Sequence, residues 1–452
     1  MIPELCCFMP PPIMKIFAAI ILLFLSFEGF AQTYWKIRTE SGEEILLSIE
    51  VNTANNTFKA FTRKDAIKDI AGFFAYNLAH AAGMLKYPEI VYIEGKAEQQ
   101  KDSLKLKGVF YYTDKKYEFQ STISGHKFTG KYIDNKNRLH QLTGEKLASN
   151  KPIRNYQTIV NTAISHAEKK LPRIDWIKSN EWSDFKKSVK ALASKISDDY
   201  ELGAVVMWYA KKLPFAPFEI EKTDRRLTSV KLTSKPRIVL VKPGLGILEG
   251  NSFPSGRKEM DSLANVIIRN KITGLVLDLR GKSRLSVSNL QVLLDYLSEQ
   301  EFSAGFFLTQ QWWNAHTSFP QFNELKNLLS GNPEAGKEVR FSGEMGYWMK
   351  ISPSKSKFSG KVFVLTDPRT NKASEILASI LKRKKLALLI GQKTAGFATL
   401  SESLPISEEY NLQIPVVEFY DTTGKTIRSS GVEPDVSCRP QESMEYVLNN
   451  FF

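Results

Sequence analysis

Cysteine and histidine are scarce in this chain of 452 residues, which contains three cysteines and five histidines. Cys6 and Cys7 lie in an N-terminal segment that we expect to be removed or not translated, so Cys438 is the one cysteine expected in the mature protein. A single cysteine excludes an internal disulfide. The histidines are scattered without the spacing of metal ligands, so we expect no metal site and no cofactor.

Long apolar runs are also missing, apart from one short run near the N-terminus. Residues 16–27 are apolar but too few to span a membrane, and small residues stand at −3 and −1 before Gln32. This pattern is typical of a secretory signal peptide. We expect residues 1–31 to be the signal, translation to begin at Met14, and the protein to be exported to the periplasm or the extracellular space without stable membrane insertion. An uncleaved anchor is the alternative.

Positive charge exceeds negative charge, with a formal net charge of +14. The lysines are spread along the whole chain, which argues against one basic surface for nucleic acid. The densest run, residues 382–385, falls at the end of an expected helix, where cations complement the helix macrodipole. We therefore expect no nucleic-acid partner.

The N-terminal part of the mature chain, residues 32–151, is predicted to be a β-rich accessory domain. Runs rich in β-branched and aromatic residues alternate with turn residues, and one apolar helical stretch at 67–82 interrupts them. The expected strands cover residues 44–51, 89–95, 104–112 and 127–133.

Helical periodicity dominates residues 152–220, which we interpret as a helical subdomain whose packing is anchored by Trp176 and Trp182. In residues 221–446, short apolar strands alternate with amphipathic helices. This alternation is typical of an α/β fold with a mainly parallel sheet covered on both faces. Residues 323–359 are rich in lysine and glycine and are expected to form a surface insertion.

Four short segments of this α/β region carry possible chemistry. Asp278, Leu279, Arg280 and Gly281 close a buried strand, and residues 370–375 follow another strand and open a helix that Thr370 or Asn371 is expected to cap. Backbone amides at such a strand-to-helix turn can stabilise an oxyanion. Residues 391–396 form a glycine-bounded loop, and residues 431–436 end the region.

Together, in this order and spacing, the four segments resemble the tail-specific, or carboxy-terminal processing, serine peptidases, the family that includes the tricorn protease core. The resemblance covers roughly residues 176–436, over half of the chain. It implies a crotonase-like α/β core and, as partner, an extended peptide or the C-terminal tail of a protein. The segment between Phe218 and Ile238 is too short for the regulatory domain that often precedes this core.

The catalytic positions depart from the family pattern. Lys372 stands where the resemblance implies the nucleophilic serine, and Phe397 stands where it implies the lysine base. Pro217 lies where other members carry a serine–histidine pair, and Ser283 and Arg284 replace the glycine pair of the oxyanion site. An ammonium group cannot supply the hydroxyl that serine hydrolysis requires.

Our first hypothesis is therefore a degenerate peptidase that holds extended peptides in the former substrate cleft by strand addition. Positive charge from Lys372, Arg284 and Lys393 would favour a free carboxylate. The expected cleft residues are Asp278, Arg280, Gly281, Arg284, Lys372, Ala373, Lys393 and Thr394.

Two alternatives remain open. In the first, Ser374 is a relocated nucleophile and a lysine with a lowered pKa is its base; in the competing interpretation, Ser374 is a first-turn helix residue that faces away from the cleft. In the second, the protein is a scaffold that acts through its N-terminal β domain. His316, beside two tryptophans, is expected to be a surface-loop residue and not a base. The sequence leaves the oligomeric state open.

Overall fold

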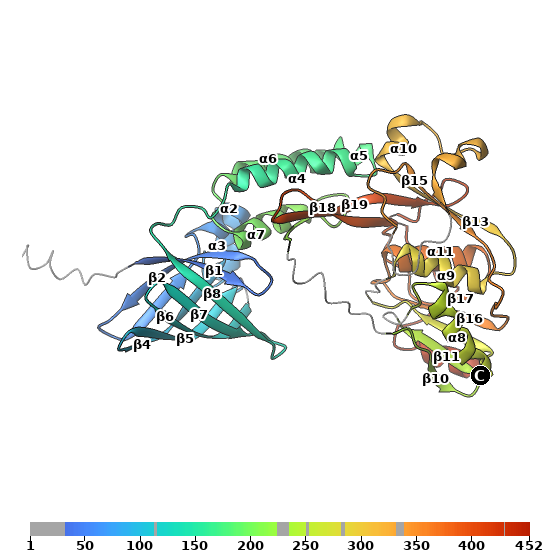
Figure 1. Ribbon diagram of the computed structural model, residues 1–452, viewed down its shortest axis with the longest axis horizontal. Coiled ribbons are helices and arrows are strands. Elements are labelled where there is room, and N and C mark those ends of the chain that lie inside the picture. Colours follow the sequence, from blue (N-terminus) through green and yellow to red (C-terminus); the bar gives the residue numbers. More distant parts are fainter. Residues whose placement is uncertain are drawn as a thin grey trace, which may run out of the picture. The chain divides into compact units, whose positions relative to one another are not determined.

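The computed structural model describes residues 32–112, 115–223, 235–249, 253–281, 285–330, 339–428 and 430–452. The predicted signal peptide, Ser283 and Arg284 lie outside the described residues. The chain forms two compact units (Figure 1). One runs to Tyr156 and includes Lys195–Ala204, and the other comprises Gln157–Ser194 and Val205–Phe452.

The first unit is a closed antiparallel barrel, which confirms the predicted β-rich domain. Each strand pairs with the next along the chain, and the last pairs with the first, so the barrel has no exposed edge. Alternate side chains point inward, and Trp35, Phe58, Phe119 and Phe128 are fully buried among them. The strands are β1 (Thr33–Thr39), β2 (Glu44–Asn52), β3 (Thr57–Phe61), β4 (Val91–Gln100), β5 (Ser103–Tyr112), β6 (Lys115–Ser124), β7 (Lys127–Ile133) and β8 (Leu139–Leu147).

The helical stretch predicted at 67–82 is two helices, not one. Gly72 separates α2 (Ala66–Ala71) from α3 (Phe73–Ala81). Its φ of 84° lies in the region that only glycine adopts without steric strain, so the chain changes direction there. The apolar composition of the stretch continues through Gly72, which explains why the break was missed.

A cluster of carboxylates at the start of α7 (Asp199–Ala210) holds the backbone of β2. Asp199 accepts a hydrogen bond from the Glu44 amide at 2.8 Å, and Asp198 accepts one from the Leu46 amide at 3.1 Å. Glu201 forms an ion pair with Arg63, whose Nε lies 2.8 Å from the carboxylate. All of these residues belong to the first unit, so the start of α7 is part of the barrel's own packing.

The predicted helical segment contains α4 (Tyr156–Lys170), α5 (Ile174–Ile177), α6 (Asn180–Ala193) and α7. As expected, Trp176 and Trp182 are buried. The ring centroid of Trp176 lies 5.1 Å from that of Phe215, and the rings of Trp182 and Phe215 lie 6.0 Å apart. Ser179 caps α6 by accepting a hydrogen bond from the Trp182 amide at 3.1 Å.

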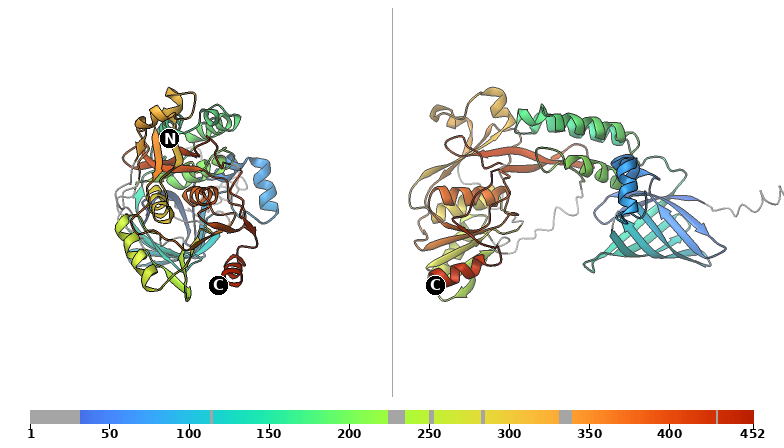
Figure 2. Two further views of the ribbon diagram at one scale, coloured as in Figure 1. Left: turned by 90° about the vertical axis from the view of Figure 1, so that its right-hand side faces the viewer. Right: turned by 180° about the vertical axis from the view of Figure 1, so that it is seen from behind.

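The second unit contains the predicted parallel sheet. From β11 onward neighbouring strands are parallel, and β10 adds an antiparallel edge. Phe363 and Leu365 pack against α12 on one face, and Val362 and Val364 alternate with them and are buried on the other. Figure 2 shows α12, in red, beside the sheet. The sheet contains β10 (Val239–Lys242), β11 (Leu245–Glu249), β12 (Gly274–Asp278), β16 (Lys361–Thr366), β17 (Leu388–Gly391) and β20 (Val436–Ser437); the helices are α8 (Arg257–Arg269), α9 (Val287–Leu297), α11 (Lys372–Arg383) and α12 (Ser443–Phe451).

The prediction of a surface insertion at 323–359 is wrong where this segment contributes a strand to a second, mostly antiparallel sheet. β15 (Gly346–Ile351) pairs along β13, and Met349 and Ile351 are completely buried. The lysine- and glycine-rich composition of the segment concealed the alternation of buried and exposed residues in β15. The other strands of this sheet are β9 (Glu219–Lys222), β13 (Phe302–Thr309), β14 (Leu329–Ser330), β18 (Thr399–Pro405) and β19 (Tyr410–Tyr420). Two short helices lie between β13 and β14 in the sequence: α10 (Gln310–Ala315) and the 3₁₀ helix η2 (Phe322–Asn327).

The basic run at the end of α11 makes contacts within the second unit. Lys382 lies 3.1 Å from the Asp435 carboxylate, and Arg383 lies 3.0 Å from that of Asp421. Lys384 stacks over the Phe302 ring at 4.5 Å from its centroid. These contacts account for much of the run's charge. Among the described residues, none of the helices has both the length and the apolar character that a membrane crossing requires.

Candidate functional site

The four segments singled out in the sequence meet at the carboxyl ends of β12, β16 and β17. The three strands are parallel neighbours, with Asp278 opposite Leu365 and Thr366 opposite Gly391. The loops that leave parallel strands emerge at the same edge of a sheet, which is where α/β proteins place their ligand sites.

Asp367, directly after β16, ties two of these loops together. Its buried carboxylate accepts hydrogen bonds from the amides of Gly281 at 3.0 Å and Thr370 at 2.9 Å. Burial raises the pKa of Asp367, but the hydrogen bond from the Gly281 amide and the contacts with Arg369 outweigh burial and hold the pKa below its ordinary value. The carboxylate therefore stays charged and fixes the loop after β12 against the turn before α11.

The predicted capping of α11 takes another form. Asn371 is the N-cap residue, but its side chain makes no capping hydrogen bond. The Thr370 hydroxyl instead donates to the Leu279 carbonyl at 2.8 Å. Threonine and asparagine are both common N-cap residues, but the Thr370 hydroxyl is already bonded to the loop that follows β12.

Lys372, the first residue of α11, has a left-handed backbone with φ of 52°. This conformation is uncommon for a residue other than glycine, and such strain concentrates at functional turns. Its amide donates to the carbonyl of Phe397 at 3.1 Å, and the Phe397 ring is 43% exposed. The positions that the resemblance assigns to the nucleophile and the base are therefore neighbours in space.

Glu375 connects α11 to the loop after β17. Its carboxylate is completely buried and accepts hydrogen bonds from the Thr394 hydroxyl, the Gly396 amide at 2.6 Å and the Phe397 amide at 2.7 Å. Burial raises the pKa of Glu375, and the three hydrogen bonds oppose this rise. Thr394 also accepts a hydrogen bond from the Val432 amide at 2.8 Å, which joins the last segment to the site.

Comparison with known proteins identifies the region that contains the turn before α11 and the loop after β17. Residues 316–438 match the model of peptidase family S41. The chain carries a peptidase S41 region. The predicted resemblance to the tail-specific peptidases is thereby confirmed, and the S41 region includes Lys372, Glu375, Phe397 and Val432.

Two curated relatives belong to the same class of peptidase. The chain is 32% identical over 78 residues to the chloroplastic C-terminal processing peptidase of Tetradesmus obliquus, and the match covers 17% of each protein. It is 28% identical over 78 residues to the carboxy-terminal processing protease CtpB of Bacillus subtilis, covering 17% of this chain and 16% of that protein. The aligned stretch is thus about a sixth of either relative.

Solved structures are more distantly similar. The photosystem II D1 C-terminal processing protease aligns with 12% identity and a TM-score of 0.39, covering 66% of this chain and 98% of that one. The tricorn protease aligns with 9% identity and a TM-score of 0.39, covering 90% of this chain and 54% of that one.

Two of the predicted cationic cleft residues are already engaged by acidic neighbours. The Arg280 guanidinium lies 2.8 Å from Asp278 through Nε and also donates to the Pro440 carbonyl at 2.5 Å. In the S41 region, Lys393 forms an exposed ion pair with Glu433 at 2.8 Å. Arg280 and Lys393 therefore each share their charge with a carboxylate of the protein itself.

The two remaining predicted cleft residues of the S41 region do not expose their side chains. Ala373 and Thr394 are buried, and the Thr394 hydroxyl is used by Glu375. Gly281, which lies outside the S41 region, donates its amide hydrogen to Asp367. Ser374, the alternative nucleophile, lies on α11 with 1% of its surface exposed.

His316 and Pro217 lie in other surroundings. His316 is half-buried. Its ring stacks on that of Trp312 with centroids 3.8 Å apart, and its Nε2 lies 3.6 Å from the Glu324 carboxylate. Pro217 lies between Phe215 and Phe218 of the aromatic cluster in the helical segment. Across the part of the chain that the structure describes, no three His, Cys, Asp or Glu side chains form a metal-binding group.

Asp367 was not among the predicted site residues, and Glu375 was a motif residue without a predicted role. The available signal was the position of Asp367 immediately after a buried strand, the place where polar residues at sheet ends usually face a site. Its partners Gly281 and Thr370 were already in the two motifs on either side.

Proposed function

We propose that this S41 chain is an exported pseudo-peptidase that binds the extended C-terminal tail of a peptide or protein without cleaving it. The observation that carries the proposal is Lys372 in the nucleophile position, at the strained first residue of α11. A crotonase-like core and a periplasmic or extracellular location are parts of the same proposal.

The absence of cleavage follows from the side chains at the two neighbouring positions. Acyl transfer by a serine-type peptidase needs a hydroxyl within hydrogen-bond reach of a base. Lys372 offers an ammonium in place of the hydroxyl, and Phe397 offers an apolar ring in place of the base. The buried position of Ser374 argues against a substitute nucleophile there.

Binding follows from the surroundings that remain. Asp367 and Glu375 still fix the loops, so the backbone of the site is ordered in advance of any ligand. The N-terminus of α11 carries partial positive charge, and the Lys372 ammonium adds a full charge next to it. A peptide's terminal carboxylate is the anion that fits a former tail-processing cleft, with its extended backbone held by strand addition.

Replacing Lys372 with methionine is expected to abolish a preference for free carboxyl ends. The probe is a fluorescein-labelled decapeptide of alanine, valine and leucine, with either a free or an amidated C-terminus, measured by fluorescence anisotropy. A charge-assisted hydrogen bond contributes about 1.5–3 kcal/mol, so the free form is expected to bind about tenfold or more tightly. The preference should disappear in Lys372→Met.

Lys393→Met is the matched control, because Lys393 is exposed and already paired with Glu433. It is expected to keep the preference for the free carboxyl end. Equal binding of the free and amidated peptides by the unmodified protein would contradict the proposal.

A further inference from the structure

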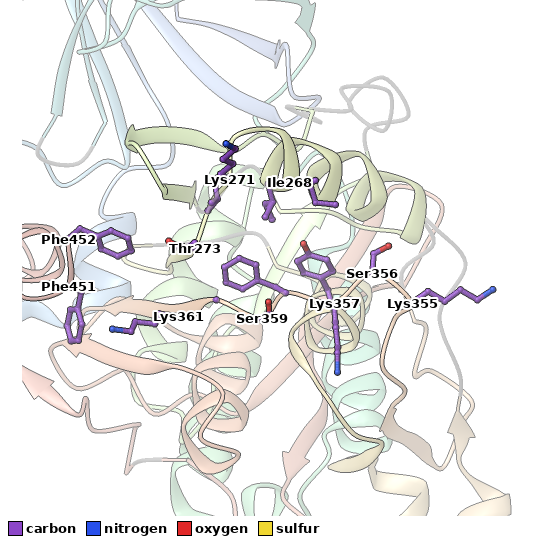
Figure 3. A pocket seen from close by; sticks show the side chains of 15 residues that line it. Ile268, Lys271, Thr273, Lys355, Ser356, Lys357, Ser359, Lys361, Phe451 and Phe452 are labelled. Atoms are coloured by element: carbon purple, nitrogen blue, oxygen red, sulfur yellow. The ribbon is translucent and has the colours of Figure 1, made fainter.

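A groove follows the amino ends of the parallel strands, at the sheet edge opposite the candidate site. One cavity of about 820 Å³ lies beside the starts of β12 and β16, and a second of about 520 Å³ lies beside the starts of β16 and β17. They share Gly360, Lys361 and Phe451 in their linings, so the two cavities adjoin, and together they are called the groove (Figure 3 shows the larger cavity). Volumes of several hundred Å³ are typical of ligand sites.

Lysine dominates the charge of this groove. Its lining contains six lysines and one acidic side chain, that of Asp435, which is paired with Lys382. Within the described ranges, the five other lysines make no ion pair; they are Lys271, Lys355, Lys357, Lys361 and Lys385. All five are exposed, and Figure 3 shows those of the larger cavity spread around its rim rather than gathered at one point.

The floor of the groove is apolar and aromatic. Tyr296 and Phe358 stack with ring centroids 6.4 Å apart, and the Lys361 ammonium lies 5.4 Å from the centroid of Phe451. Ile268 at the edge of the cavity is 67% exposed. Tyr296 and Phe358 are themselves buried, so the exposed apolar surface of the groove comes from side chains such as Ile268 and Phe452. Apolar surface inside a charged rim is the arrangement of protein interaction surfaces.

The ends of helices account for the positions of only two of these five lysines. Lys271 follows the end of α8 and Lys385 follows the end of α11, where cations complement the partial negative charge of the last turn. Lys355 and Lys357 lie in the loop before β16, and Lys361 begins that strand. No helix end accounts for these three, and no acidic side chain in the described residues neutralises them.

We propose that this groove binds an acidic, extended segment of a partner protein, with apolar side chains on the aromatic floor and carboxylates toward the lysine rim. The spread of the lysines favours a ligand with several separated negative charges over a single anionic head group. This site is independent of the proposed carboxylate binding at Lys372, because it occupies the opposite edge of the sheet and needs no free chain end.

The test uses a fluorescein-labelled dodecapeptide that alternates glutamate with leucine and phenylalanine and is amidated at its C-terminus. The full-length mature protein is titrated at low and high salt, and a second peptide carries glutamine in place of each glutamate. We expect the acidic peptide to bind and to weaken with salt, and the glutamine peptide to bind at least tenfold more weakly.

The decisive variant is Lys355→Glu/Lys357→Glu/Lys361→Glu, expected to weaken binding of the acidic peptide about tenfold to hundredfold. The matched control reverses three exposed lysines outside the groove, Lys187→Glu/Lys190→Glu/Lys326→Glu. Thermal unfolding checks that both variants are folded. Equal loss in the two variants, or unchanged binding in the first, would overturn the proposal, and Lys372→Met should leave this binding unchanged.

Discussion

Replacing Glu375 with alanine is expected to destabilise the S41 region by about 3 kcal/mol. The carboxylate is completely buried and accepts hydrogen bonds from Thr394, Gly396 and Phe397. Its removal leaves three donors without partners, each worth about 1–3 kcal/mol when buried. Loss of the carboxylate's own desolvation penalty offsets part of this sum. Urea unfolding followed by far-UV circular dichroism measures the change.

A conservative variant at the same position and a control variant elsewhere test whether the lost stability comes from these hydrogen bonds. Glu375→Gln keeps the volume and one acceptor oxygen but turns an NH₂ group toward an amide donor, so a loss of about 1–2 kcal/mol is expected. Glu445→Ala changes an exposed glutamate on α12 and should stay within about 0.5 kcal/mol of the unmodified protein. A Glu375→Ala protein as stable as Glu445→Ala would show that the loop after β17 is held by other contacts.

The barrel unit is expected to become less stable as pH rises from 5 to 7. Burial, with the neighbouring carboxylates of Glu201 and Asp199, raises the pKa of Asp198 to about 7, although hydrogen bonds from the Glu201 and Leu46 amides oppose the rise. The ordinary value in an unfolded chain is about 3.9. Between these values the folded state holds a proton that the unfolded state releases, so the free energy of unfolding falls as pH rises, by up to about 1.4 kcal/mol per pH unit.

The expected total is about 4 kcal/mol, lost between pH 4 and pH 7. Carboxylates of the barrel whose pKa is lowered, such as Asp69 beside Arg63, change stability mainly below pH 4 and so lie outside the window from pH 5 to pH 7. Chemical unfolding at half-unit pH steps measures the slope. Asp198→Asn cannot titrate and should flatten the profile; the same slope in both proteins would rule out Asp198 as its source.

Local patterns predicted the β-rich character of the N-terminal domain and the parallel sheet, because each strand has its own alternation or apolar run; the closure of the strands into a barrel was not predicted. β7 was predicted at the residues where it occurs, 127–133, and the buried run ending at Asp278 is β12. Two features were missed because the local amino-acid composition suggested a different secondary structure from the one that the backbone adopts. Gly72 ends one helix and begins the next, and β15 alternates within a lysine- and glycine-rich segment.

The candidate site was predicted from motif positions, and those positions do meet in space through the bond between Lys372 and Phe397. What the sequence could not provide was the partner of each side chain. Arg280 was expected in the cleft but pairs with Asp278, and Lys393 pairs with Glu433. The Lys393–Glu433 pair joins segments that follow different strands, and the Arg280–Asp278 pair depends on how the chain turns at the end of β12. No periodicity in the sequence encodes either pair.

The most direct test of the central claim, binding without cleavage, is digestion of a mixed library of unstructured peptides by the purified mature protein, read by mass spectrometry. Ser374→Ala, prepared in parallel, separates the protein's own activity from contaminating proteases. The account predicts identical peptide maps for both proteins and for a sample without protein. Cleavage by the unmodified protein that disappears in Ser374→Ala would contradict it and would identify a relocated serine peptidase site.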